Sequence, residues 1–229
     1  MHFSILHVSD LHRDPSDDLK NGWLLESLER DLARCSEQMP AIPQPELCIV
    51  SGDVVFGVRP DAARAAQEIE RQYAQAEEFL VGLADRLFDG DRERIVIVPG
   101  NHDVSFFDFM SCIERVDAGA VGKDKKKLVT ELFSQTGRLR WSWEDLCFYR
   151  ITDENRYGLR FKPFADFYAR FYEKKRSFSP DPTGQFDVFD FPKLGFCLLA
   201  LNSCHDNDPF RRAGTFHPDC LAAGSRSLR

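Results

Sequence analysis

The feature that most limits the possible folds of this chain is an alternation of short apolar runs with longer segments of helical periodicity. Residues 3–8, 47–50 and 95–98 are apolar runs of strand length, and each ends in a polar loop. Segments 16–39 and 60–88 lie between them and repeat apolar residues at helical spacing. This order predicts an α/β protein with a layered sheet, mostly parallel in its N-terminal half and flanked by helices.

The rest of the chain departs from this alternation. Residues 104–183 are rich in aromatic side chains, and they include the charge run 123–127 and an aromatic segment of helical spacing at 161–172. Strand-like runs return at 186–201, and a helix is expected to begin at Pro218. We therefore divide the chain into three parts: the N-terminal half of a core (1–103), an inserted cap or lid (104–183) and a continuation of the core (184–229).

Composition narrows the class of protein. The chain has 229 residues, and its apolar runs are far too short to span a membrane. No basic segment precedes Asp10, so we expect no export signal and a cytoplasmic location. The seven cysteines, without a C-x-x-C pair, favour reduced thiols. A net charge of −7 does not indicate a general nucleic-acid-binding surface. It does not exclude such a surface either, because carboxylates that bind metal ions would contribute to this charge.

A polar cluster follows each of the three predicted strands: Asp10 and His12, then Asp53, then Asn101, His102 and Asp103. The carboxyl ends of neighbouring parallel strands open on one crevice, so these clusters are expected to meet in space. Asp10 and His12 are two apart, so on an extended segment both would point the same way and chelate one ion. Asp53 has two oxygens that can bridge two ions, and Asn101 offers an amide oxygen. Gly100 lets the backbone come close to the site.

The motifs D-x-H at 10–12, G-D at 52–53 and G-N-H-D at 100–103 resemble the first three motifs of the calcineurin-like metallophosphoesterase superfamily. Segment 196–204 also resembles the strand that follows the cap in long members. The resemblance implies a hydrolase with a dinuclear metal centre, in which Asp10 and His12 bind the first ion, Asp53 bridges and Asn101 binds the second. A bridging hydroxide would attack phosphorus.

In the same scheme His102 stabilises the transition state or protonates the leaving oxygen, and Asp103 orients its imidazole. The mixed nitrogen and oxygen ligands favour Mn²⁺, with Fe or Zn²⁺ as alternatives. We expect a phosphodiesterase or phosphatase acting on a nucleotide or nucleic-acid phosphoester, with the cap setting substrate choice. A cyclic-nucleotide phosphodiesterase and a nuclease both remain open.

The chain also departs from the superfamily pattern, because it lacks the three later histidines, including a terminal G-H-x-H. Only His205 and His217 follow His102. We expect His205 to be a solvated loop residue and His217 a local cap, with replacement of a missing ligand left open. The absence of these histidines predicts that the chain is the N-terminal part of a longer protein, which would have further C-terminal domains. The alternative is a non-catalytic binding or scaffold module with an incomplete metal site.

Two other features have an ordinary and a functional interpretation. The charge run 123–127 is typical of a solvated face, and the alternative is that it grips a polyanion. The aromatic segment 161–172 is typical of the packed face of a cap helix, and the alternative is base stacking by one of its rings.

Overall fold

The core sheet consists of three parallel strands, in the order β1 (Ser4–Val8), β2 (Pro45–Ser51) and β3 (Ile95–Val98). The structure is a computed structural model that describes residues 3–16, 19–59, 64–116, 124–134, 136–212 and 214–228. Leu6 lies opposite Cys48 on β2, and Val50 lies opposite Ile97 on β3. All three strands therefore end at the same edge. The prediction of a parallel sheet in the N-terminal half is confirmed.

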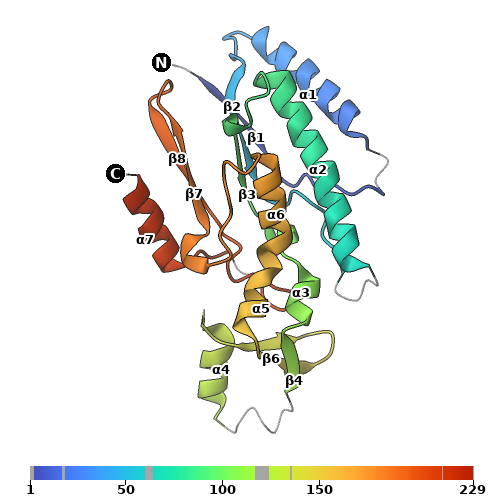
Figure 1. Cartoon of the computed structure of the whole chain (residues 1–229), viewed down its shortest axis with the longest axis vertical. Helices are drawn as coiled ribbons and strands as arrows, with labels where there is room; N and C mark the ends of the chain where they lie inside the picture. The colour runs from blue at the N-terminus through green and yellow to red at the C-terminus, as the bar shows by residue number, and fades with distance from the viewer. Residues whose placement is uncertain are drawn as a thin grey trace.

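Helices α1 (Asn21–Ser36) and α2 (Ala65–Leu87) connect these strands and pack against each other (Figure 1). The apolar stripe of α2 faces the core, where Leu80 and Leu83 are fully buried. The short 3-10 helix η1 (Arg92–Arg94) leads into β3. None of the helices in the described part of the chain is long and apolar enough to cross a membrane.

A hairpin of β7 (Phe186–Phe191) and β8 (Phe196–Leu201) lies beside β3, and α7 (Pro218–Ser227) packs on it (Figure 1). The side chains of Phe189 and Ala200 on the hairpin belong to the same hydrophobic cluster as residues of the core sheet. The 3-10 helix η4 (Pro182–Gly184) precedes β7. The expected strands at 186–201 and the helix beginning at Pro218 are both present.

The aromatic segment forms η3 (Leu159–Phe161) and α6 (Lys162–Phe171), and α6 packs against α2. Phe164, Phe167 and Phe171 are fully buried in the main cluster. The hydroxyl of Tyr172 donates to the carbonyl of Ile95 on β3 at 2.5 Å. The sequence predicted that this segment is a helix with one packed face, but it assigned the helix to a cap. In the structure the packed face of α6 belongs to the core. Helical periodicity identifies the buried face of a helix and not its packing partner.

The part of the insert that leaves the core is a second, antiparallel sheet with strand order β4-β6-β5. The strands are β4 (Ile113–Val116), β5 (Leu139–Ser142) and β6 (Cys147–Ile151), and helix α4 (Lys125–Phe133) lies against β5. Helices α3 (Phe106–Met110) and α5 (Glu154–Gly158) lie between this sheet and the core (Figure 1). We call β4, β5, β6 and α4 the inserted sheet unit, which lies at one end of the molecule (Figure 1).

Candidate metal centre

The loops that follow the three core strands, residues 9–13, 52–57 and 99–105, lie together at one edge of the sheet; we call them the strand-end loops. The N–H of Asp10 donates to the carbonyl of Gly52 at 3.3 Å, and the N–H of His12 donates to the carbonyl of Asp53 at 2.9 Å. The N–H of His102 donates to Asp53 Oδ1 at 2.9 Å. The first and second loops are therefore joined by backbone hydrogen bonds, and the second and third by a bond from a backbone N–H to the Asp53 carboxylate.

Three of the predicted ligands have left-handed backbone conformations. The φ angles are 55° at Asp10, 44° at His12 and 51° at Asp53. Such conformations are uncommon for residues other than glycine and cost on the order of 1–3 kcal/mol each. They persist because the hydrogen bonds between the loops hold them. Strain concentrated at three candidate ligands favours a functional role for this edge of the sheet.

Close backbone packing gives Gly100 a specific role. A Cβ atom at Gly100 would lie 2.1 Å from Asp53 Oδ1 and 2.2 Å from the backbone nitrogen of Asp53. No side chain fits at this distance, so glycine is what allows the Asp53 carboxylate to lie against the third loop. This agrees with the close approach expected at Gly100 from the sequence.

His12, Asp53 and His102 form a group that could hold a metal ion, and we call it the metal-binding cluster. One nitrogen or oxygen atom from each lies within 4.8 Å of the others, and no other such group of three occurs in the described part of the chain. Asp10 Oδ1 lies 3.7 Å from His12 Nε2. His12 Nδ1 is buried and has no hydrogen-bond partner. An unpaired imidazole nitrogen on a ring that belongs to a group of nitrogen and carboxylate ligands fits a divalent transition-metal ion, so the residues present suit the predicted metal.

The imidazole of His102 is oriented by the backbone. Its Nδ1 lies 2.6 Å from the carbonyl oxygen of Phe56. A carbonyl only accepts, so Nδ1 carries the proton, and in the neutral ring Nε2 keeps its lone pair. Nε2 is therefore the atom that can bind an ion or exchange a proton. The expectation that Asp103 orients this ring is corrected, because Phe56 does so.

Asp103 instead joins two of the strand-end loops through its buried carboxylate. It is 1% exposed, and its Oδ2 accepts the N–H groups of Gly100 at 2.8 Å and Val54 at 3.2 Å. Its Oδ1 accepts the hydroxyl of Tyr73 at 3.2 Å. Burial raises the pKa of Asp103 to about 6, the charge of Asp53 adds to this, and the hydrogen bonds oppose it. A buried carboxylate with these partners has a positioning role in the loop that carries His102.

Asn101 begins the 3-10 helix η2 (Asn101–Asp103) immediately before His102, and it is partly exposed. His205 does not join the cluster: its ring lies 5.3 Å from that of His217, and its side chain is only 16% exposed. A solvated loop role was expected for His205, and the structure differs because backbone hydrogen bonds, such as those between Asp208 and Arg211, fold segment 202–212 back on itself. His217 caps α7 as predicted, accepting the N–H of Asp219 at 3.3 Å.

Two residues that shape the site, Phe56 and Tyr73, were not predicted from the sequence. Phe56 acts through its carbonyl, which leaves no trace in the identity of the residue. Tyr73 lies on the apolar stripe of α2, and its hydroxyl also lies 3.2 Å from the carbonyl oxygen of Asp103. A buried hydroxyl in an apolar stripe needs a polar partner, and that requirement is a usable signal.

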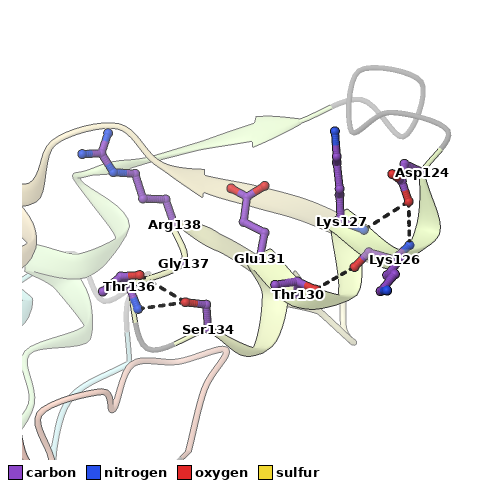
Figure 2. A pocket seen from close by; sticks show the side chains of 9 residues that line it. All are labelled: Asp124, Lys126, Lys127, Thr130, Glu131, Ser134, Thr136, Gly137 and Arg138. Atoms are coloured by element: carbon purple, nitrogen blue, oxygen red, sulfur yellow. Dashed lines mark hydrogen bonds between the residues drawn. The ribbon is translucent and has the colours of Figure 1, made fainter.

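The charge run borders an open groove of about 660 Å³ on the inserted sheet unit (Figure 2). Lys127, Glu131 and Arg138 point to the same side of it. Glu131 also pairs with Arg150, and Arg138 with Glu154. Lys123 lies outside the described residues, as does the side chain of Lys125. The described charges are mixed in sign, which favours the solvated-face interpretation.

The fold and the cluster define an α/β protein with candidate metal ligands at the carboxyl edge of a parallel sheet. Residues 3–194 match the family model described as calcineurin-like phosphoesterase, and the chain belongs to this family. The family comprises phosphoesterases that generally use divalent metal ions. Comparison with curated proteins and with solved structures gave no significant match. The match confirms the resemblance and the metallophosphoesterase-like fold, and it includes residues 104–183, where no motif had been recognised.

Proposed function

We propose that this protein hydrolyses a phosphoester with the help of two divalent metal ions, Mn²⁺ being preferred. The observation that carries the proposal is the convergence of His12, Asp53 and His102 at the carboxyl edge of the parallel sheet. Family membership supports the same reaction class.

In this proposal Asp10 and His12 hold one ion, Asp53 contributes to both, and Asn101 adds an amide oxygen to the second. Divalent ions bound there would lower the pKa of a water molecule and offset the negative charge of the phosphate. The backbone hydrogen bond from His102 to Asp53 Oδ1 holds the carboxylate in place. The Asp53 carboxylate is therefore positioned before an ion or a substrate arrives.

His102 is proposed as the catalytic residue that donates a proton to the leaving oxygen or stabilises charge on the phosphate. The carbonyl of Phe56 holds the Nδ1 proton. Proton transfer is consequently assigned to Nε2, which takes up a proton from solvent to give the imidazolium and then passes that proton to the leaving oxygen. Asp103 serves as a positioning residue through its bonds to Gly100, Val54 and Tyr73.

The proposed substrate is a phosphodiester or phosphomonoester of nucleotide or nucleic-acid type. The metal ligands contact only the phosphate, so selectivity has to come from side chains around the strand-end loops. The alternative is a non-catalytic binding module that retains the fold, and it is favoured by the absence of the superfamily's later histidine motifs from the sequence.

Hydrolysis of bis(p-nitrophenyl) phosphate with Mn²⁺, by the chain and by its Asp53→Asn variant, tests the proposal. Asparagine keeps an oxygen for the His102 N–H but loses the charge, so we expect a loss of about 1,000-fold, which is about 4 kcal/mol. Asp190→Asn, an exposed change on β7, serves as the matched control and should retain activity.

Equal activity in the native chain and Asp53→Asn would place the reaction outside this cluster. A native chain that neither hydrolyses the ester nor binds Mn²⁺ by calorimetry would favour the binding module. Circular dichroism of both variants verifies that the fold is retained.

A further inference from the structure

Phe56 is a large apolar residue that is exposed to solvent beside the metal-binding cluster. It is 56% exposed and lies three residues after Asp53 in a strand-end loop. Its ring centroid lies 6.0 Å from that of His12 and 6.1 Å from that of His102. The ring therefore stands next to both imidazoles of the candidate centre.

The neighbours of Phe56 show that its exposure is specific to this position. Val54 and Val55 are fully buried, and Val58 packs against the main hydrophobic cluster. Phe56 lies outside the hydrophobic clusters of the described residues. Unlike these valines the Phe56 ring is not used by the core, so its face is available to a ligand bound at the cluster.

The backbone around Phe56 is held on both sides. Its N–H donates to the carbonyl of Arg13 at 3.4 Å, and its own carbonyl accepts the Nδ1 proton of His102. The next residue, Gly57, exchanges two hydrogen bonds with the side chain of Gln72, at 2.9 and 3.3 Å. Gln72 is itself only 2% exposed. The ring is thus presented on a rigid loop, which lowers the entropy lost when a ligand packs on it.

We propose that Phe56 is the specificity-determining side chain of this site, and that it packs on a planar aromatic group of the substrate, such as a nucleobase. The inference rests on the proposed phosphoester hydrolysis. The His12 and His102 rings lie in edge contact, with centroids 4.5 Å apart, so a phosphate bound beside this pair would bring its ester group alongside the Phe56 ring. Phenylalanine offers a π face and no hydrogen-bonding group, so it selects for an aromatic ring and tolerates every base.

The experiment compares two ligands that differ only in the base: adenosine 5′-monophosphate and ribose 5-phosphate. Each is titrated by calorimetry into the Mn²⁺-loaded 229-residue chain. We expect the nucleotide to bind about tenfold more tightly, the equivalent of about 1.4 kcal/mol. In Phe56→Ala this preference should fall below about twofold, and Phe56→Tyr should restore it, because tyrosine keeps the aromatic face.

Phe133→Ala is the matched control, since Phe133 is 78% exposed but lies on α4 in the inserted sheet unit. It should keep the tenfold preference. The inference is overturned, with the proposed function intact, if the native chain hydrolyses bis(p-nitrophenyl) phosphate but binds the two ligands equally, or if Phe56→Ala keeps the preference. A native chain that binds no Mn²⁺ overturns the proposed function and this inference with it.

Discussion

The strand-end loops and the inserted sheet unit are held in place by different kinds of interaction. In the loops the main contacts are backbone hydrogen bonds, such as those from Asp10 to Gly52 and from His12 to Asp53. Left-handed φ angles and a glycine close contact complete the arrangement. These features follow from a few adjacent residues in each motif.

The inserted sheet unit is attached through side chains. Arg140 on β5 donates to Asp208 Oδ2 at 2.6 Å, and both side chains are at most 3% exposed. Tyr149 on β6 stacks on Phe210, with ring centroids 5.1 Å apart. Arg211 donates to the carbonyl of Ser134 at 3.0 Å. In each of these contacts one partner, Asp208, Phe210 or Arg211, belongs to segment 202–212, which lies far along the chain from the inserted sheet unit.

The difference between these two regions shows which part of such a protein a short sequence motif can specify. Loops that follow adjacent parallel strands are brought together by the sheet, so their chemistry can be inferred from local sequence. A unit attached by a buried ion pair, a stacked ring and a hydrogen bond from Arg211 depends on partners that no local pattern identifies. Three changes test this contrast, and they are given in order of decreasing expected effect.

The largest effect is expected for Asp208→Ala, which leaves the buried Arg140 guanidinium without the carboxylate that balances its charge. Loss of one member of a buried pair costs about 3–5 kcal/mol, so urea unfolding should show a decrease in the free energy of unfolding of that size. Glu144→Ala, at the exposed β5–β6 turn, should change it by less than about 0.5 kcal/mol. A decrease below about 1 kcal/mol for Asp208→Ala would mean that other contacts hold the unit.

The second change, Gly100→Ala, acts on the strand-end loops. The new Cβ would overlap Asp53, so the carboxylate has to move, and we expect Mn²⁺ affinity to fall by about 100-fold, or about 2.7 kcal/mol. Gly22→Ala on α1 is the control, because a Cβ there meets no atom within 4 Å. If calorimetry finds unchanged Mn²⁺ affinity in Gly100→Ala, close backbone packing is not what positions Asp53.

The third change concerns the pH dependence of the metal-free protein. Burial raises the pKa of Asp103 from 3.8 to about 6 in the folded chain. Between these values the folded state keeps a proton that the unfolded state releases, so the free energy of unfolding falls as the pH rises through this window. Asp103→Asn removes this contribution, and at pH 7 in EDTA the variant should be more stable by about 1–3 kcal/mol.

Asparagine fits the Asp103 site because its oxygen still accepts from Gly100 and Val54, and its amide can donate to the Tyr73 hydroxyl. Urea unfolding at pH 5 and pH 7 measures the difference between native chain and variant. A constant difference across this range would show that Asp103 does not titrate there. Asp190→Asn, an exposed change, should give a curve parallel to the native one.

Much of the fold and of the candidate site could be predicted from the sequence. The parallel sheet, the helix that His217 caps and the convergence of His12, Asp53 and His102 follow from alternation and from polar residues at strand ends. The core position of α6 could not be predicted, because its periodicity would be the same in a cap. Phe56 was not identified as a site residue, since its carbonyl is common to all residues and its exposure depends on the fold.

The sequence by itself determined the α/β class and the residue types that gather at one edge of the sheet. It could do so because strand alternation is local and parallel strands share an edge. Only the tertiary structure decided that Phe56, rather than Asp103, orients His102, and that Arg140 joins Asp208. The physical reason is that such contacts depend on the relative placement of distant segments, which results from packing of the whole chain.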